Sequence, residues 1–182
     1  MRIKGAVAAA ALMLAGCTTT SPVLPMAPAP VVPPVRVGPA ASPIATSVLV
    51  PAGSQLVYVS GTVPDAANPN APAGSNDRFG NTETQTRSIL GKIEKALSAH
   101  GMNLSDVVMM RVFLVAPPGQ RAMDFAGMMK AYVERFNTPQ QPNRPARSTM
   151  EVSGLVDPGW LVEIEATAAR PPNQVILTGA SN

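Results

Sequence analysis

Apolar and polar residues alternate along several short stretches of the chain, and two longer stretches carry apolar residues at helical spacing. Strict alternation is typical of half-buried strands, whereas apolar residues three and four positions apart are typical of amphipathic helices. The patterns predict the following elements: strands at 47–50, 56–60, 107–115, 148–152 and 160–168, and helices at 82–99 and 123–136. The predicted order is ββαβαββ, an α+β fold in which two helices cover one face of a mixed sheet.

Turn residues and helix signals set the expected boundaries of these elements. The segment 51–54, Pro-Ala-Gly-Ser, separates the first two strands and predicts that they pair as a hairpin. Thr82 and Gln85 have the spacing of a capping box, which predicts the start of the first helix, and Gly101 marks its end.

The first residues have the layout of a secretory signal: a basic start with Arg2 and Lys4, then an apolar run to Gly16. A membrane-spanning helix needs about 20 apolar residues, so this run is too short to be one. The run ends in Leu-Ala-Gly-Cys at 14–17, which resembles the bacterial lipobox. We therefore expect residues 1–16 to be removed and Cys17 to be lipidated. The alternative is an ordinary signal peptide that contains a cysteine.

A lipid on Cys17 would attach the protein to a membrane of the cell envelope, since several acyl chains give lasting attachment. Thr18 follows the cysteine in place of Asp, and by similarity to enteric sorting patterns this indicates the outer membrane, facing the periplasm. Eight prolines occupy the 22 positions from 22 to 43, which favours an extended tether over 17–43. We expect the folded domain at 44–171, followed at 172–182 by a tail or a docking strand.

Charge and composition exclude several classes of function. Without the signal the chain carries 12 basic and 11 acidic residues, and it has no clustered basic face, which argues against nucleic acid as a partner. Cys17 is the only cysteine, so an internal disulfide, a thiol nucleophile and a cysteine metal site are excluded from the domain. His100 is the only histidine and follows a helix, which argues against a serine–histidine–carboxylate triad. We expect no metal and no cofactor.

Arg147 and Glu163 are the candidate functional residues that the pattern itself indicates. Arg147 opens a strand, and Glu163 lies on the strand that follows across the turn at 157–159. A guanidinium binds a carboxylate through two parallel hydrogen bonds, and a nearby carboxylate can orient or deprotonate a water. The alternative is that the two side chains pair with each other or lie on a solvated face.

Several segments, taken in order, resemble one known family. They are Leu-Val-Tyr-Val-Ser-Gly at 56–61, the first helix with Gln85, Ser-Asp-Val-Val at 105–108, Phe125 with Tyr132 and Phe136, Pro-Ala-Arg-Ser at 145–148, and Val-Glu-Ile-Glu-Ala at 162–166. The set resembles the Rid family, the YjgF-type reactive-intermediate deaminases. The resemblance implies a chorismate-mutase-like fold and a homotrimer with clefts between its subunits.

The resemblance also implies roles for individual residues. Arg147 would bind the substrate carboxylate, Glu163 would place the hydrolytic water, and Ser60 would lie beside the ligand. Thr149 would offer a backbone N–H to the carboxylate. Two departures stand out: residues 38–47 contain no aromatic side chain where many members have a tyrosine, and Met129 replaces an asparagine.

Two functions follow as hypotheses. The first is a lipid-anchored, cofactor-independent hydrolase that converts small 2-imino or 2-enamino carboxylates to 2-oxo acids and ammonia. The second is a membrane-tethered module that binds a carboxylate ligand or a partner in the same cleft without turnover. The first is the leading hypothesis. The predicted export motivates the second, because the imines that familiar relatives handle arise largely in the cytoplasm, and the missing tyrosine supports it too.

Overall fold

A computed structural model describes residues 31–171 of the chain. The predicted signal peptide at 1–16, the lipidation site Cys17, most of the predicted tether and the tail at 172–182 lie outside the described residues. Within the described part, no helix combines the length and the apolar character that crossing a membrane requires.

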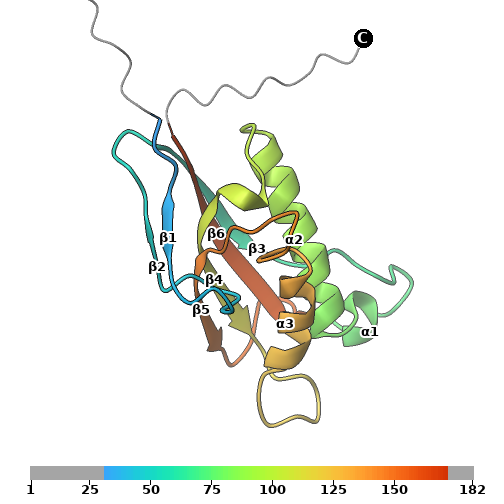
Figure 1. The fold of residues 1–182 in the computed structure, drawn as a ribbon. Helices are drawn as coiled ribbons and strands as arrows, with labels where there is room; N and C mark the ends of the chain where they lie inside the picture. The colour runs from blue at the N-terminus through green and yellow to red at the C-terminus, as the bar shows by residue number, and fades with distance from the viewer. Residues whose placement is uncertain (1–30, 172–182) are drawn as a thin grey trace, which may run out of the picture. The chain divides into compact units, whose positions relative to one another are not determined.

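The elements follow one another in the order β-β-β-α-α-β-α-β-β (Figure 1). They are β1 (Val35–Val37), β2 (Ser47–Leu49), β3 (Gln55–Thr62), α1 (Asn76–Phe79), α2 (Thr82–Ser98), the 3₁₀ turn η1 (Leu104–Asp106), β4 (Val107–Leu114), α3 (Phe125–Val133), β5 (Ala146–Glu151) and β6 (Val162–Arg170). Each predicted helix and strand is present within a few residues of its expected bounds. The predicted α+β class is confirmed.

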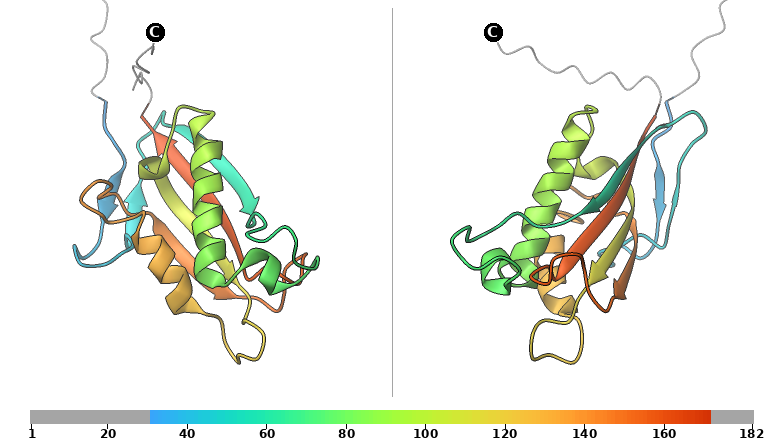
Figure 2. Two further views of the ribbon diagram at one scale, coloured as in Figure 1. Left: turned by 90° about the vertical axis from the view of Figure 1, so that its right-hand side faces the viewer. Right: turned by 180° about the vertical axis from the view of Figure 1, so that it is seen from behind.

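The main sheet has four strands in the order β3-β6-β4-β5. Strands β4 and β5 run parallel, whereas β6 is antiparallel to both of its neighbours, so the sheet is mixed as expected. The helices α2 and α3 lie together on one face (Figure 2). No described helix covers the other face, which we call the open face. The strands β3 and β5 form the two edges.

The core lies between the sheet and the two helices. Every second residue of β6 is buried against the helices, from Val162 through Ile164 and Ala166 to Ala168, and α2 contributes a matching apolar face. The residues of α2 in this face are Ile89, Leu90, Ile93 and Leu97. Burial of apolar side chains of this kind stabilises a fold by about 1.5–3 kcal/mol for each side chain.

The start of α2 differs from the predicted capping box. Asn81 is the N-cap, and its side chain accepts a hydrogen bond from the backbone N–H of Thr84. The fully buried amide of Gln85 instead donates to the carbonyls of Gly80 at 3.0 Å and Gly159 at 2.9 Å, and it accepts from the N–H of Leu161 at 2.7 Å. Gln85 therefore joins α2 to the segment that leads into β6.

The predicted pairing of the first two strands is wrong. Strand β2 pairs antiparallel with β1, whereas β3 pairs with β6. Strand β1 lies in the stretch that we expected to be an extended tether. The strand consists of two valines with Arg36 between them, and the neighbouring prolines lie outside it. The guanidinium of Arg36 donates to the carbonyls of Ser105 and Val107. These contacts order residues 35–37 despite the proline-rich composition around them.

Candidate functional site

Arg147 lies on β5, where its Cα is in register with that of Met110, a core residue. Its side chain therefore points towards the helices, and four residues of α3 surround the guanidinium. The guanidinium carbon lies 4.3 Å from the ring centroid of Tyr132 and 5.8 Å from that of Phe125. Nη2 lies 3.2 Å from the sulfur of Met129, and Nη1 lies 3.9 Å from that of Met128.

The charge of Arg147 has no acidic partner within residues 31–171, where the ion pairs join other side chains. Burial lowers the pKa of Arg147, because the protonated form loses hydration. Burial also raises the pKa of Tyr132, so its phenol stays neutral beside the cation. Partly buried charges are normally paired. Arg147 is therefore a partly buried cation that aromatic rings and thioethers surround and that no carboxylate among residues 31–171 balances.

Thr149 lies two positions further along β5 and faces the same side of the sheet as Arg147, since it is in register with buried Val112. Its hydroxyl is buried and has no hydrogen-bond partner among the described residues. The structure therefore brings two of the predicted site residues, Arg147 and Thr149, to the same face of the same strand.

Glu163, on β6, lies against Gly61 of the edge strand β3, the residue that follows Ser60. The register between β3 and β6 shifts between Val59 and Thr62, so Ser60 and Gly61 lie in a bulge. The carboxylate of Glu163 packs against the backbone of Gly61, because a Cβ at that position would overlap its Oε1. A bulge at a sheet edge re-aims side chains, and here it leaves room for a carboxylate beside Ser60.

Arg147 and Glu163 do not converge within one chain. We expected them on neighbouring strands, but β4 lies between β5 and β6. The two side chains also lie on opposite faces, because Arg147 shares the face of Met110, whereas Glu163 alternates with the core residues Val162 and Ile164. The segment between β5 and β6 crosses β4 instead of forming a hairpin. The alternative that the two side chains pair with each other is excluded for the same reason.

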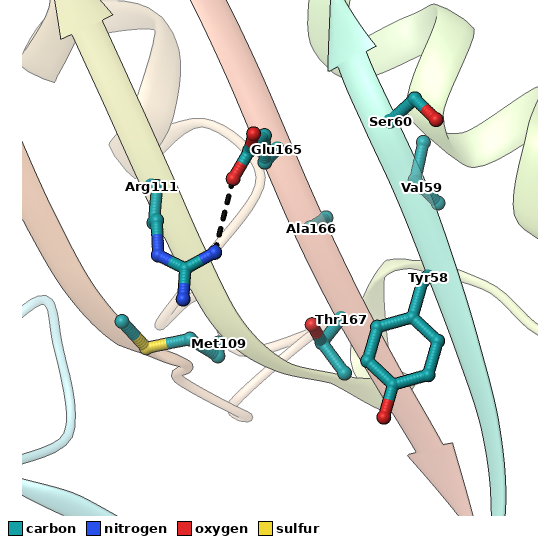
Figure 3. Close-up of a pocket in the computed structure, with 8 residues that line it drawn as sticks. All are labelled: Tyr58, Val59, Ser60, Met109, Arg111, Glu165, Ala166 and Thr167. Atoms are coloured by element: carbon teal, nitrogen blue, oxygen red, sulfur yellow. Dashed lines mark hydrogen bonds and ion pairs between the residues drawn. The ribbon is translucent and has the colours of Figure 1, made fainter.

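A second group of polar side chains lines a hollow of about 200 Å³ on the open face (Figure 3). Its lining residues are Tyr58, Val59, Ser60, Met109, Arg111, Glu165, Ala166 and Thr167. The guanidinium of Arg111 and the carboxylate of Glu165 form an ion pair across β4 and β6 at 3.1 Å. Tyr58 is 75% exposed. Ser60 is the only predicted site residue in this lining, and the ion pair leaves Arg111 less available to a ligand than Arg147.

The sequence did not indicate which residues surround Arg147. Met129 was noted as a departure from the family pattern but not as a neighbour of Arg147, although its sulfur contacts the guanidinium directly. The available signal was the spacing of 125, 128, 129 and 132, which places these residues on one face of a helix. Within the described residues, no three histidine, cysteine, aspartate or glutamate side chains gather closely enough to hold a metal ion.

Comparisons with known proteins agree on one family. A family model described as Endoribonuclease L-PSP matches residues 40–170. A RutC family protein of Pyrococcus horikoshii is 38% identical over 89 residues, which cover 49% of this chain and 63% of that protein, under two thirds of its length. A RutC family protein of Haemophilus influenzae is 30% identical over 111 residues, 61% of this chain and 79% of that protein.

Solved structures show the same relationship. A protein of unknown function of the conserved Rid protein family, YyfB from Yersinia pestis, has a TM-score of 0.51 and 25% identity, and the match covers 76% of this chain and 96% of that one. A protein described as a putative translation initiation inhibitor, from Vibrio vulnificus, has a TM-score of 0.50 and 27% identity, with 76% and 94% covered. Because the family match spans most of the sequence, this chain belongs to the Endoribonuclease L-PSP family, the group whose members are also named RutC, YjgF and Rid.

Proposed function

We propose that this protein is a hydrolytic deaminase that converts small 2-imino or 2-enamino carboxylates to 2-oxo acids and ammonia. The proposal rests on the surroundings of Arg147. Its guanidinium is partly buried, has thioether and aromatic neighbours, and has no acidic partner among residues 31–171. Its planar fork fits a carboxylate. Glu163, placed by the bulge at Ser60 and Gly61, supplies the base in this proposal.

The site requires two protomers, because one chain separates Arg147 from Glu163. Arg147 lies on the edge strand β5, whereas Ser60 and Gly61 lie on the opposite edge strand, β3. In a ring of three or more protomers the two surfaces that meet are different, so the β5 edge of one protomer can face the β3 edge of the next. The homotrimer expected from the family resemblance has this symmetry. Exposed apolar side chains on the open face support self-association: Leu56, Tyr58 and Met150.

The reaction then needs only positioning and proton transfer. Arg147 of one protomer holds the carboxylate, and Glu163 of the next accepts a proton from a water that attacks C2 of the imine. The C=N bond becomes a C–N single bond, and the protonated Glu163 returns its proton to the nitrogen. The carbinolamine hydroxyl then loses a proton to Glu163, which passes it to the nitrogen, and ammonia leaves as the C=O bond forms. An enamine first gains a proton at C3. Water is the only co-reactant, and positioning together with general base catalysis provides the acceleration.

Subunit mixing tests both the residues and the shared site. Arg147→Ala and Glu163→Gln are each expected to be inactive with 2-iminopropanoate generated by an amino-acid oxidase. When the two variants are co-expressed with different tags and purified as mixed trimers, one of the three interfaces in each trimer regains both residues, and about a third of wild-type activity returns. Mixed assemblies that stay inactive beside an active wild type would rule out a shared site. An inactive wild type would rule out the deaminase.

A second candidate is a binding module without turnover. Its specific support is that the surroundings of Arg147 come entirely from β5 and α3 of one chain and do not need Glu163. Pyruvate would then raise the melting temperature of wild type and Glu163→Gln equally, while no imine is hydrolysed. Ribonuclease activity, which the family description names, has less support, because the chain after residue 16 carries 12 basic and 11 acidic residues.

A further inference from the structure

Two of the four residues around Arg147 are fully buried and two reach the surface. Tyr132 and Met128 are 1% and 0% exposed and close the inner side of the guanidinium. Phe125 is 43% exposed, and Met129 is half-buried. Among these four neighbours, the side that is open to a carboxylate is therefore that of Phe125 and Met129.

The groups attached to that carboxylate meet an apolar surface. The ring of Phe125 lies within 5.8 Å of the guanidinium carbon, and the sulfur of Met129 lies 3.2 Å from Nη2. Neither side chain offers a strong hydrogen-bonding or charged group to a hydroxyl, an amine or a second carboxylate, whereas both gain from covering hydrocarbon. Methionine is unbranched and flexible, so it adapts to side chains of different shape.

We infer that Met129 is a specificity-determining residue, and that the site selects 2-imino acids with an apolar side chain of three or more carbons over small or polar ones. This inference rests on the proposed function, since it names the substrate class of the same site. Discrimination by one or a few methylene groups in an apolar pocket is about tenfold or more. The preference is expected mainly in KM, because the apolar contact is present in both the ground state and the transition state.

The test compares two substrates and three variants. D-amino acid oxidase generates 2-imino-4-methylpentanoate from D-leucine and 2-iminopropanoate from D-alanine, and the measured quantity is the ratio of the two kcat/KM values. Wild type and Met129→Leu are expected to favour the leucine-derived imine by about tenfold or more. Met129→Gln, which keeps the length of the side chain and adds an amide, is expected to reduce that ratio about tenfold. Val156→Gln adds an amide to a side chain that is 93% exposed in the loop between β5 and β6, and it is expected to keep the wild-type ratio.

Calorimetry with the product 2-oxo acids separates the failure of this inference from the failure of the proposed function. The ratio of Kd values for 4-methyl-2-oxopentanoate and pyruvate needs no turnover and should follow the same order among the variants. Turnover of both imines with a ratio that Met129→Gln leaves unchanged would overturn the role of Met129 and leave the deaminase standing. If the wild type hydrolyses neither imine, the inference about substrates is overturned, even where the Kd values of the 2-oxo acids follow the expected order.

Discussion

Two arginines, Arg170 and Arg147, lie in similar places on the sheet and in opposite electrostatic surroundings. The side chain of Arg170, at the end of β6, is 9% exposed and forms an ion pair with Asp106, with Nη2 2.5 Å from Oδ2. Its Nη1 also donates to the carbonyl of Gly101. Arg147, near the start of β5, has sulfur atoms and aromatic rings as neighbours and no carboxylate among residues 31–171.

Arg170 is a structural cation with a partner inside the chain, whereas Arg147 is the cation of the proposed binding site. The charge of Arg170 is balanced inside the chain, where it ties β6 to the turn η1 and to the end of the loop after α2. The charge of Arg147 is desolvated without being balanced, which costs stability unless a ligand supplies the anion. Natural proteins retain such a group where it serves a function.

The largest expected effect is on stability, from Arg170→Met. The variant leaves the carboxylate of Asp106, 14% exposed, without its partner. Breaking a buried pair in this way lowers the free energy of unfolding by about 3–5 kcal/mol, measurable by urea denaturation. Arg147→Met is the matched control, and it is expected to change the free energy of unfolding by less than about 1 kcal/mol or to increase it. Equal losses in the two variants would remove the distinction between the arginines.

The next effect is on activity, from Arg147→Lys. Lysine keeps the positive charge but cannot reproduce the planar fork, so kcat/KM for the imine is expected to fall about 100-fold, equivalent to about 2.7 kcal/mol. The free energy of unfolding should stay at the wild-type value. Equal kcat/KM values for the variant and wild type would show that Arg147 does not hold the carboxylate.

The smallest effect is expected from Gly61→Ala. The new Cβ overlaps Oε1 of Glu163, so the carboxylate must move from its place beside the bulge. We expect kcat to fall about tenfold, while the Kd for the 2-oxo acid product stays unchanged because Arg147 is untouched. Gly91→Ala is the control, since a Cβ at this helical position meets nothing within 4 Å. A weaker Kd with unchanged kcat would contradict the role given to Glu163.

The pattern of the sequence was sufficient for the type and order of most elements. The alternation in β6 and the helical spacing in α2 are local properties, and local propensity decides between strand and helix where the pattern is strong. The prediction of a capping box that starts at Thr82 was wrong. Asn81 and Thr82 are neighbouring polar residues that can each serve as an N-cap, and Asn81 does so here. The fold class needed no more than these patterns.

The site was predicted only as a set of residues. Arg147, Thr149, Ser60 and Glu163 were all named, but the sequence did not show that they form two groups, or that Met129 belongs to the first. A strand pattern states which residues share a face, but it does not state which strand lies next to which.

The chain by itself determined the elements and the face of each strand that is apolar, and it indicated Arg147 as a candidate functional residue. Only the tertiary structure decided that β2 pairs with β1, that β6 lies between β3 and β4, and that Arg147 and Glu163 point to opposite sides of the sheet. The physical reason is that backbone hydrogen bonds are alike for every pair of strands. The choice of partner therefore depends on how the whole apolar surface is buried against α2 and α3.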